Sequence, residues 1–152
     1  MSRVARFAGA ALTVVIAGAA IWYVSAPPKG SDGYRERMAD ATRTLRSQVQ
    51  SARIWAATFA GGDATSAATL VGFEEAERDA SSAASQFESY EPARRYLPLR
   101  SRFVALAADA TGALADLRIA AELDAWGRVP EVAGRLDNLA ASLERFERRA
   151  RR

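Results

Sequence analysis

The chain has 152 residues, which suits a single compact domain, or a smaller domain plus an anchor, and leaves no room for two ordinary domains. It contains no His and no Cys, so disulfides, thiolate nucleophiles, imidazole bases and the usual zinc, haem and iron–sulfur ligand sets are excluded. The formal net charge is +3 and the sequence pI is about 9.8, a basic balance that raises the question of nucleic-acid binding.

A membrane anchor is the first element that the sequence predicts. Residues 1–6 form a short cationic segment with Arg3 and Arg6, and residues 7–26 carry no charge. Twenty residues at helical rise cover roughly 30 Å, the thickness of a hydrocarbon core. We therefore expect residues 7–26 to form a transmembrane signal-anchor helix. The residues that carry this prediction are Phe7, Leu12, Val15, Ile16, Ile21, Trp22 and Tyr23.

Two alternatives for this segment compete with an anchor. Residues 24–26 have the small side chains of a signal-peptidase site, but Pro27 follows, and the apolar run exceeds the 7 to 15 residues of a typical h-region. A soluble helix buried on every side is the other alternative. The cationic n-region favours a cytoplasmic N-terminus and an extracytoplasmic bundle over the reverse, although cations near the two ends of the span are balanced.

Residues 27–33 read as a Pro/Gly linker, and residues 34–147 then read as a bundle of four helices. Gly61 and Gly62 end the first helix, and Asp63, Thr65 or Ser66 caps the second. Pro98 and Pro130 suit the first turns of the third and fourth. The predicted helices span about 34–60, 63–89, 98–126 and 129–147.

Apolar residues recur every three or four positions along each helix, as expected for one buried face. Short breaks favour antiparallel neighbours, so we expect an all-α fold with an up-down-up-down four-helix bundle. An extended helical hairpin, or coiled coil, is the alternative. The predicted seams are Met38, Thr42, Leu45, Val49, Ala52, Ala56 and Phe59; Ala67, Leu70, Phe73, Glu77, Ala80, Ala84 and Phe87; Leu99, Phe103, Leu106, Ala110, Ala113, Leu117 and Ala120; and Val129, Val132, Leu136, Leu139, Leu143 and Phe146.

The basic excess lies at the two ends of the chain. Residues 29–144 carry fourteen basic and seventeen acidic side chains, whereas residues 145–152 carry five arginines and one glutamate. Such a tail lacks the aromatic and base-reading partners of a nucleic-acid interface, so no nucleic-acid partner is expected. In an up-down-up-down bundle the tail returns to the membrane side. We predict that Arg148, Arg149, Arg151 and Arg152, in the basic tail 148–152, contact anionic lipid headgroups. The alternative is a solvated C-terminus that complements the helix dipole.

One acidic residue stands out, because the second seam places Glu77 between two apolar positions. Either the predicted seam of the second helix is out of register at this point, or Glu77 is a buried acid paired with Arg46 or Arg53 of the first helix. The other carboxylates of this stretch are typical of a solvated face. A di-iron centre of the bundle type needs His, so neither a metal nor a cofactor is expected.

No nucleophile elbow, Ser-x-x-Lys motif or phosphate-cradling loop occurs, so no enzymatic activity is expected. The sequence predicts a single-pass membrane protein that acts by binding or scaffolding, with the lipid bilayer and a protein partner or second copy as its contacts. One alternative is a sensor or carrier of an apolar or lipid-like ligand, in a cavity lined by Leu106, Leu117, Leu136 and Leu139. The other is an accessory subunit of a membrane enzyme or transport complex.

Overall fold

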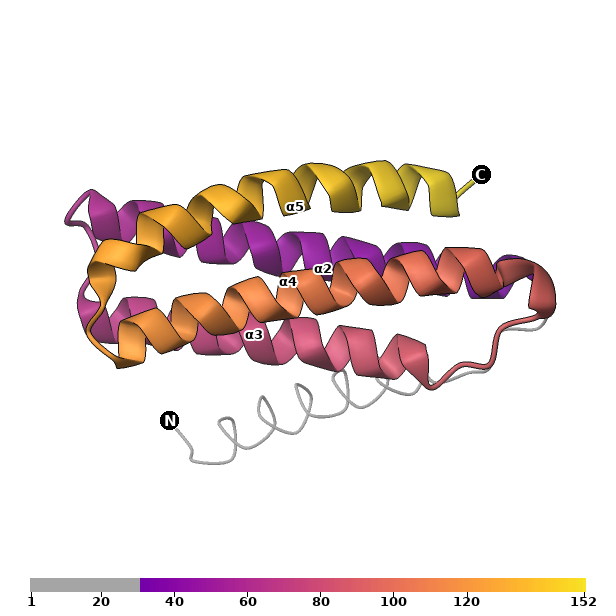
Figure 1. The fold of residues 1–152 in the computed structure, drawn as a ribbon, viewed down its shortest axis with the longest axis horizontal. Coiled ribbons are helices and arrows are strands. Elements are labelled where there is room, and N and C mark those ends of the chain that lie inside the picture. Colours follow the sequence, from indigo (N-terminus) through magenta and orange to yellow (C-terminus); the bar gives the residue numbers. More distant parts are fainter. Residues whose placement is uncertain (1–30) are drawn as a thin grey trace, which may run out of the picture. The chain divides into compact units, whose positions relative to one another are not determined.

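Four helices follow one another along residues 31–152, which are the residues that the computed structural model describes (Figure 1). These residues contain no strand. The helices and short 3-10 turns are α2 (Ser31–Ala60), α3 (Ser66–Glu88), η1 (Arg94–Tyr96), α4 (Leu97–Glu122), η2 (Trp126–Arg128) and α5 (Val129–Ala150).

The predicted cationic segment 1–6, the predicted span 7–26 and the start of the predicted linker lie outside the described residues. Within residues 31–152, no helix combines the length and the apolar character needed to cross a bilayer.

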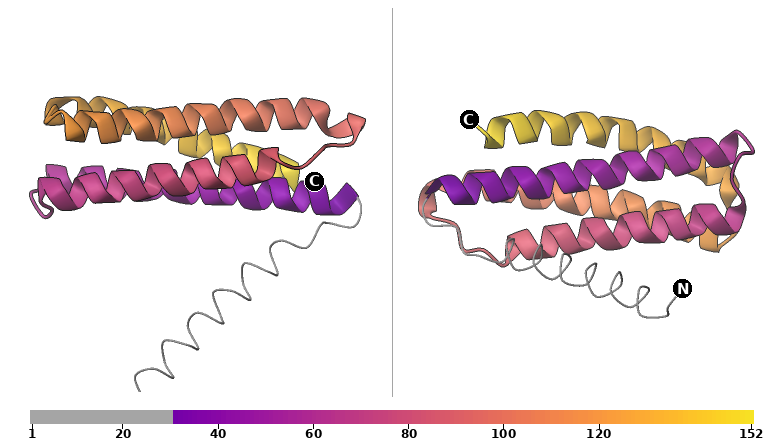
Figure 2. Two further views of the ribbon diagram at one scale, coloured as in Figure 1. Left: turned by 90° about the horizontal axis from the view of Figure 1, so that it is seen from below. Right: turned by 180° about the vertical axis from the view of Figure 1, so that it is seen from behind.

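Successive helices run in opposite directions and pack side by side (Figure 2). α2 packs against α3 and α5, and α4 packs against the same two helices from the other side. The all-α fold and the four-helix bundle are therefore confirmed, and the extended hairpin is wrong because α2 closes the bundle against α5. We call the two ends of the bundle the Ser31 end, where α2 begins and α5 ends, and the Ala60 end, where α2 ends and α5 begins.

The helix starts follow the local sequence closely. Thr65 is the N-cap of α3, and its hydroxyl oxygen accepts a 3.2 Å hydrogen bond from the backbone N–H of Ala68. Proline lies in the first turn of both α4 and α5, as predicted. α2 begins at Ser31, so the predicted linker 27–33 is too long at its C-terminal end. Ser and Asp, which open α2, are residue types that favour a helix N-terminus.

The observed C-terminal ends of the helices differ from the predicted ends more than the N-terminal ends do. α4 ends at Glu122 and not near residue 126, because Asp124 adopts a left-handed conformation with φ of 55°. Hydrogen bonds from Ala125 N to Ala120 O (2.8 Å) and from Asp124 N to Ala121 O (3.1 Å) complete a Schellman motif. Gly62, with φ of 81°, ends α2 in the same way. α5 continues to Ala150, so most of the predicted tail is helical.

The buried faces match the predicted seams over most of their length. Every predicted seam residue of α2 from Met38 to Ala56 is buried. Alanine is the commonest buried residue within residues 31–152, and five aromatic rings form a cluster at the Ser31 end. Neighbouring ring centroids there lie 4.4 to 6.2 Å apart, which brings aromatic groups from all four helices into one cluster. Its members are Tyr34, Phe87, Tyr96, Phe103 and Phe146.

A single glycine sets how closely α2 and α3 approach. A Cβ atom added to Gly72 would lie 2.4 Å from the Trp55 ring, so only glycine leaves room for the indole. Gly112 and Gly134 have no neighbouring atom within 4 Å of such a Cβ atom and do not mediate close approach.

Replacing these glycines should therefore change stability in opposite directions. Gly72→Ala forces Trp55 out of its position and should lower the free energy of unfolding by roughly 1–3 kcal/mol, as overpacking does. Gly112→Ala adds a methyl group on an open helix face and should raise it by about 0.5–1 kcal/mol. Urea unfolding followed by circular dichroism measures both. Equal effects of the two substitutions would contradict the Trp55 contact.

Candidate functional site

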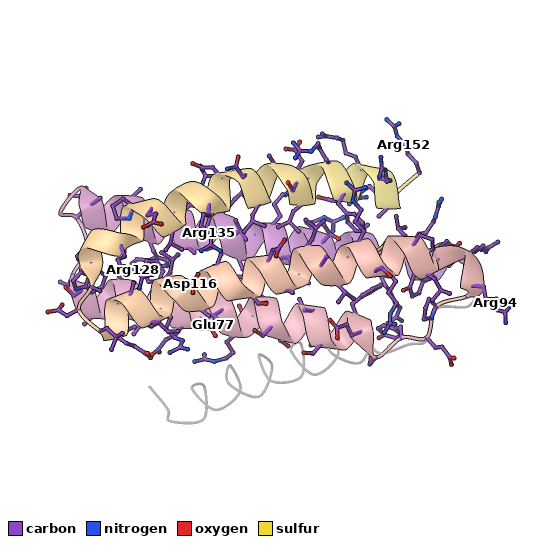
Figure 3. All side chains as sticks on the ribbon, viewed as in Figure 1. Glu77, Arg94, Asp116, Arg128, Arg135 and Arg152 are labelled. Carbon is purple, nitrogen blue, oxygen red and sulfur yellow. The ribbon has the colours of Figure 1, made fainter. Side chains whose placement is uncertain are left out.

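Charge is distributed unevenly between the two ends of the bundle. When each helix is divided at its middle, the half at the Ser31 end comprises residues 31–45, 78–109 and 140–152. This half carries thirteen arginines and nine carboxylates, whereas the half at the Ala60 end carries five arginines and nine carboxylates. The bundle as a whole is therefore neutral, with a net charge of +4 on one half and −4 on the other. Figure 3 shows Arg94 and Arg152 at the Ser31 end and Arg128 at the opposite end.

The arginines predicted to touch a membrane differ in their surroundings. Arg148 pairs with Glu144 one turn earlier, and Arg151 donates a 2.9 Å hydrogen bond to Glu147. Arg149 and Arg152 are exposed and have no carboxylate partner within residues 31–152. All four lie at the Ser31 end, two of them free to bind an anion, and their contact with lipid stays a prediction.

Glu147 is the buried acid of the bundle, and the sequence patterns did not identify it. Its side chain is 9% exposed, and three guanidinium groups surround its carboxylate. The nitrogen–oxygen distances are 3.4 Å to Arg43, 3.2 Å to Arg46 and 2.9 Å to Arg151. Because two of these arginines belong to α2, the carboxylate ties α5 to α2 near the Ser31 end. The signal that could have found it is its place beside Phe146 on the α5 seam.

Glu77 has a different partner from either one predicted. Its side chain is 24% exposed, and Oε2 accepts a 2.6 Å hydrogen bond from Nε of Arg118 on α4. Arg118 also donates to Glu122, and these hydrogen bonds raise the pKa of its guanidinium above the ordinary value. The expected pairing with Arg46 or Arg53 is wrong because those side chains point toward α5, where they pair with Glu147 and Asp137.

Cations also cover the aromatic cluster at the Ser31 end. The guanidinium carbons of Arg35 and Arg95 lie 5.8 and 4.8 Å from the centre of the Tyr96 ring. The Tyr34 hydroxyl is buried without a hydrogen-bond partner. Burial raises the pKa of Tyr34, and the nearby Arg100 offsets part of that rise.

Two adjacent hollows at the Ser31 end are lined by arginine. One, of about 180 Å³ between α4 and α5, has Leu106 and Phe146 as its apolar floor and contains the Ser142 side chain. Arg102, Arg145 and Arg149 line it, and no carboxylate does. The second, of about 270 Å³, is lined by Arg145, Arg148, Arg149 and Arg152.

A larger apolar hollow of about 470 Å³ lies between α2 and α5 at the Ala60 end. Phe59 and Trp126 stack there with ring centroids 4.1 Å apart. Leu117 and Leu136, two of the residues expected to line a leucine cavity, do not line this hollow and are fully buried in the core. The hollow is lined by Arg53, Ala56, Ala57, Phe59, Ala60, Trp126, Val129, Pro130, Ala133, Gly134 and Asp137.

Residues 31–152 contain no group of three or more acidic side chains placed to hold a metal ion. No protein-family model, curated protein or solved structure matches the chain. Fold and surface together define the class of protein as a small four-helix bundle with one arginine-rich end.

The buried Tyr34 hydroxyl makes the free energy of unfolding depend on pH in the alkaline range. Because its pKa is raised in the folded state, the folded chain holds the phenolic proton more tightly than the unfolded chain does. This stabilisation is fully present below about pH 10, the ordinary tyrosine value, and is lost as the pH rises through the folded pKa.

Above about pH 10, unfolding free energies from urea titrations should therefore fall more steeply for the natural chain than for Tyr34→Phe. At neutral pH, Tyr34→Phe should be as stable as the natural chain or more stable, since it removes an unpartnered hydroxyl. Parallel pH profiles of the two proteins would contradict this assignment.

Proposed function

We propose that the chain is a membrane-anchored binding or scaffolding protein whose bundle turns its Ser31 end toward anionic lipid headgroups. In this proposal the uncharged segment 7–26 spans the bilayer and the bundle lies on the extracytoplasmic side. A protein partner or a second copy binds the parts of the bundle that face away from the lipid.

The separation of charge along the bundle is the observation that carries this proposal. The +4 half is the half at which α2 begins, so it is the end joined to the apolar segment by the shortest stretch of chain. Each arginine near an anionic surface contributes about 1 kcal/mol of attraction. The −4 half is repelled by the same surface, so the two halves favour the same orientation.

A partner surface has its own support in exposed apolar side chains. Leu123 is 71% exposed, and Ile119 lies one turn before it near the Ala60 end of α4. Ile54 and Val71 are exposed on α2 and α3. An accessory-subunit role, in which another protein supplies the chemistry, would use the same side chains.

Vesicle binding by residues 31–152 tests the lipid contact. These residues form a separate compact unit with their own core, and circular dichroism of the same sample checks that they fold. We expect them to float with phosphatidylglycerol-containing vesicles, to stay behind with pure phosphatidylcholine, and to be released by salt. Arg149→Gln with Arg152→Gln should weaken binding by about 2 kcal/mol, roughly thirtyfold.

The matched control is Arg78→Gln with Arg128→Gln, which removes the same charge from two exposed arginines, one at the middle of α3 and one at the Ala60 end. It should leave vesicle binding close to that of the natural sequence. Failure to bind anionic vesicles at low salt would reject the proposal, as would equal losses in the two double variants.

The apolar hollow at the Ala60 end supports a second candidate function, carriage or sensing of a small apolar molecule. Its volume of about 470 Å³ is in the range of ligand pockets, and its walls are alanines and two stacked aromatic rings. The Arg53–Asp137 ion pair at its edge offers one cation to an acidic head group.

Anilinonaphthalene sulfonate, an aromatic probe with one anionic group, tests this candidate by fluorescence. Gly134→Leu fills the hollow and should weaken binding by about tenfold, a loss of about 1.4 kcal/mol. Gly112→Leu is the matched control, because it is also an exposed helix glycine without neighbours within 4 Å. Absence of saturable probe binding, or the same affinity in both variants, would reject the hollow as a binding site for a small apolar molecule.

A further inference from the structure

Three arginines converge on one small hollow without a carboxylate among them. Arg102 comes from α4, whereas Arg145 and Arg149 come from successive turns of α5. Arg102 and Arg149 have no acidic partner within residues 31–152, and Arg145 donates a 3.0 Å hydrogen bond to the Ser142 hydroxyl. Like charges one helical turn apart repel each other, and a bound anion would reduce this repulsion between Arg145 and Arg149.

Seven other arginines of residues 31–152 differ from the three at the hollow, because each has a carboxylate partner. These are Arg43, Arg46, Arg53, Arg118, Arg135, Arg148 and Arg151. Acidic residues next to the hollow are already engaged, since Glu144 pairs with Arg148 and Glu147 with three other arginines. The three guanidinium groups of the hollow are therefore available to a ligand.

The shape of the hollow indicates the kind of anion. Leu106 and Phe146 form an apolar floor, which lowers the local dielectric and strengthens ion contacts above it. A volume of about 180 Å³ admits a compact group and leaves the rest of a larger ligand outside. Each guanidinium presents a planar fork of donors that fits phosphate oxygens in pairs.

We propose that this hollow, lined by Arg102, Arg145 and Arg149, binds a phosphomonoester group. Such a group carries a charge of about −1.5 to −2 at neutral pH and three terminal oxygens, which matches three guanidinium forks better than a singly charged phosphodiester does. The group belongs either to a lipid headgroup or to a free metabolite. In its lipid form the inference rests on the proposed function and adds headgroup selectivity to it.

Two experiments on the full chain distinguish these sources. In the first, the chain in dodecyl maltoside is titrated with glycerol 3-phosphate by calorimetry. In the second, the chain is reconstituted in phosphatidylcholine nanodiscs that contain phosphatidic acid or phosphatidylglycerol at equal lipid charge, and hydrogen exchange of residues 140–152 is followed. Saturable binding in the first experiment, without selective protection by phosphatidic acid in the second, indicates a free phosphomonoester. Protection by phosphatidic acid alone, without glycerol 3-phosphate binding, indicates the lipid.

Arg102→Gln with Arg145→Gln should lower affinity by about tenfold or more, whereas the control pair Arg78→Gln with Arg128→Gln should not change it. Arg149→Gln provides an independent test if the first variant unfolds. Equal responses to the two anionic lipids, together with no glycerol 3-phosphate binding, overturn the inference. That result leaves binding to anionic vesicles intact, so it is distinguishable from failure of the proposed function. Equal losses in the test and control variants also overturn it.

Discussion

The small size of the buried side chains is the constraint on which the bundle depends. Alanine supplies thirteen of the twenty-eight buried hydrophobic residues of residues 31–152 and contributes to the buried face of each helix, for example through Ala52, Ala80, Ala110 and Ala140. Such faces bury little area unless the helices approach closely, and Gly72 with Trp55 shows how close α2 and α3 come. Leu117 and Leu136, expected to line a cavity, are fully buried in this core, and the hollows described above lie toward the two ends of the bundle.

Close packing also determines where charge accumulates. Glu147 is the one buried charged residue among residues 33–152, and its carboxylate contacts Arg43, Arg46 and Arg151. These contacts neutralise part of the positive charge of the three arginines, which makes them less available to bind an external anion. They also fix the end of α5 against α2. Arg102 of α4 and Arg145 and Arg149 of α5 do not contact Glu147 and line a separate hollow between those two helices. The arginines that hold Glu147 and the arginines that line the hollow are thus different residues at the Ser31 end of the bundle.

The fold was predictable because its signals are local and periodic. Spacing alone identified every buried position of α2 from Met38 to Ala56 except Ala39, and the prolines identified where α4 and α5 begin. The end of α4 was missed, because Asp124 takes the left-handed conformation usually occupied by glycine. The partner of Glu77 was missed because seam spacing places a residue on a face without saying which neighbouring helix lies opposite.

The candidate site was only partly predictable for a related reason. Counting charges along the sequence located the basic excess at Arg145 to Arg152. The contribution of Arg102 to the hollow could not be found in this way, because it depends on α4 lying beside α5. Likewise, the neutralisation of Arg151 by Glu147 depends on helical spacing within α5 continuing to Ala150. The division of the bundle into a positive and a negative half appears only when residues from all four helices are assigned to its two ends.

The orientation of the bundle on an anionic bilayer is the central claim, and label quenching measures it directly. Because the chain has no cysteine, Ala93→Cys at the Ser31 end and Ala67→Cys at the Ala60 end give clean attachment points for a fluorophore. The full chain is placed in nanodiscs that contain phosphatidylglycerol and a lipid with a nitroxide on its headgroup. The charge separation predicts stronger quenching at position 93 than at position 67, with a difference that shrinks as salt is added. Equal quenching at the two positions, or stronger quenching at position 67, would contradict it.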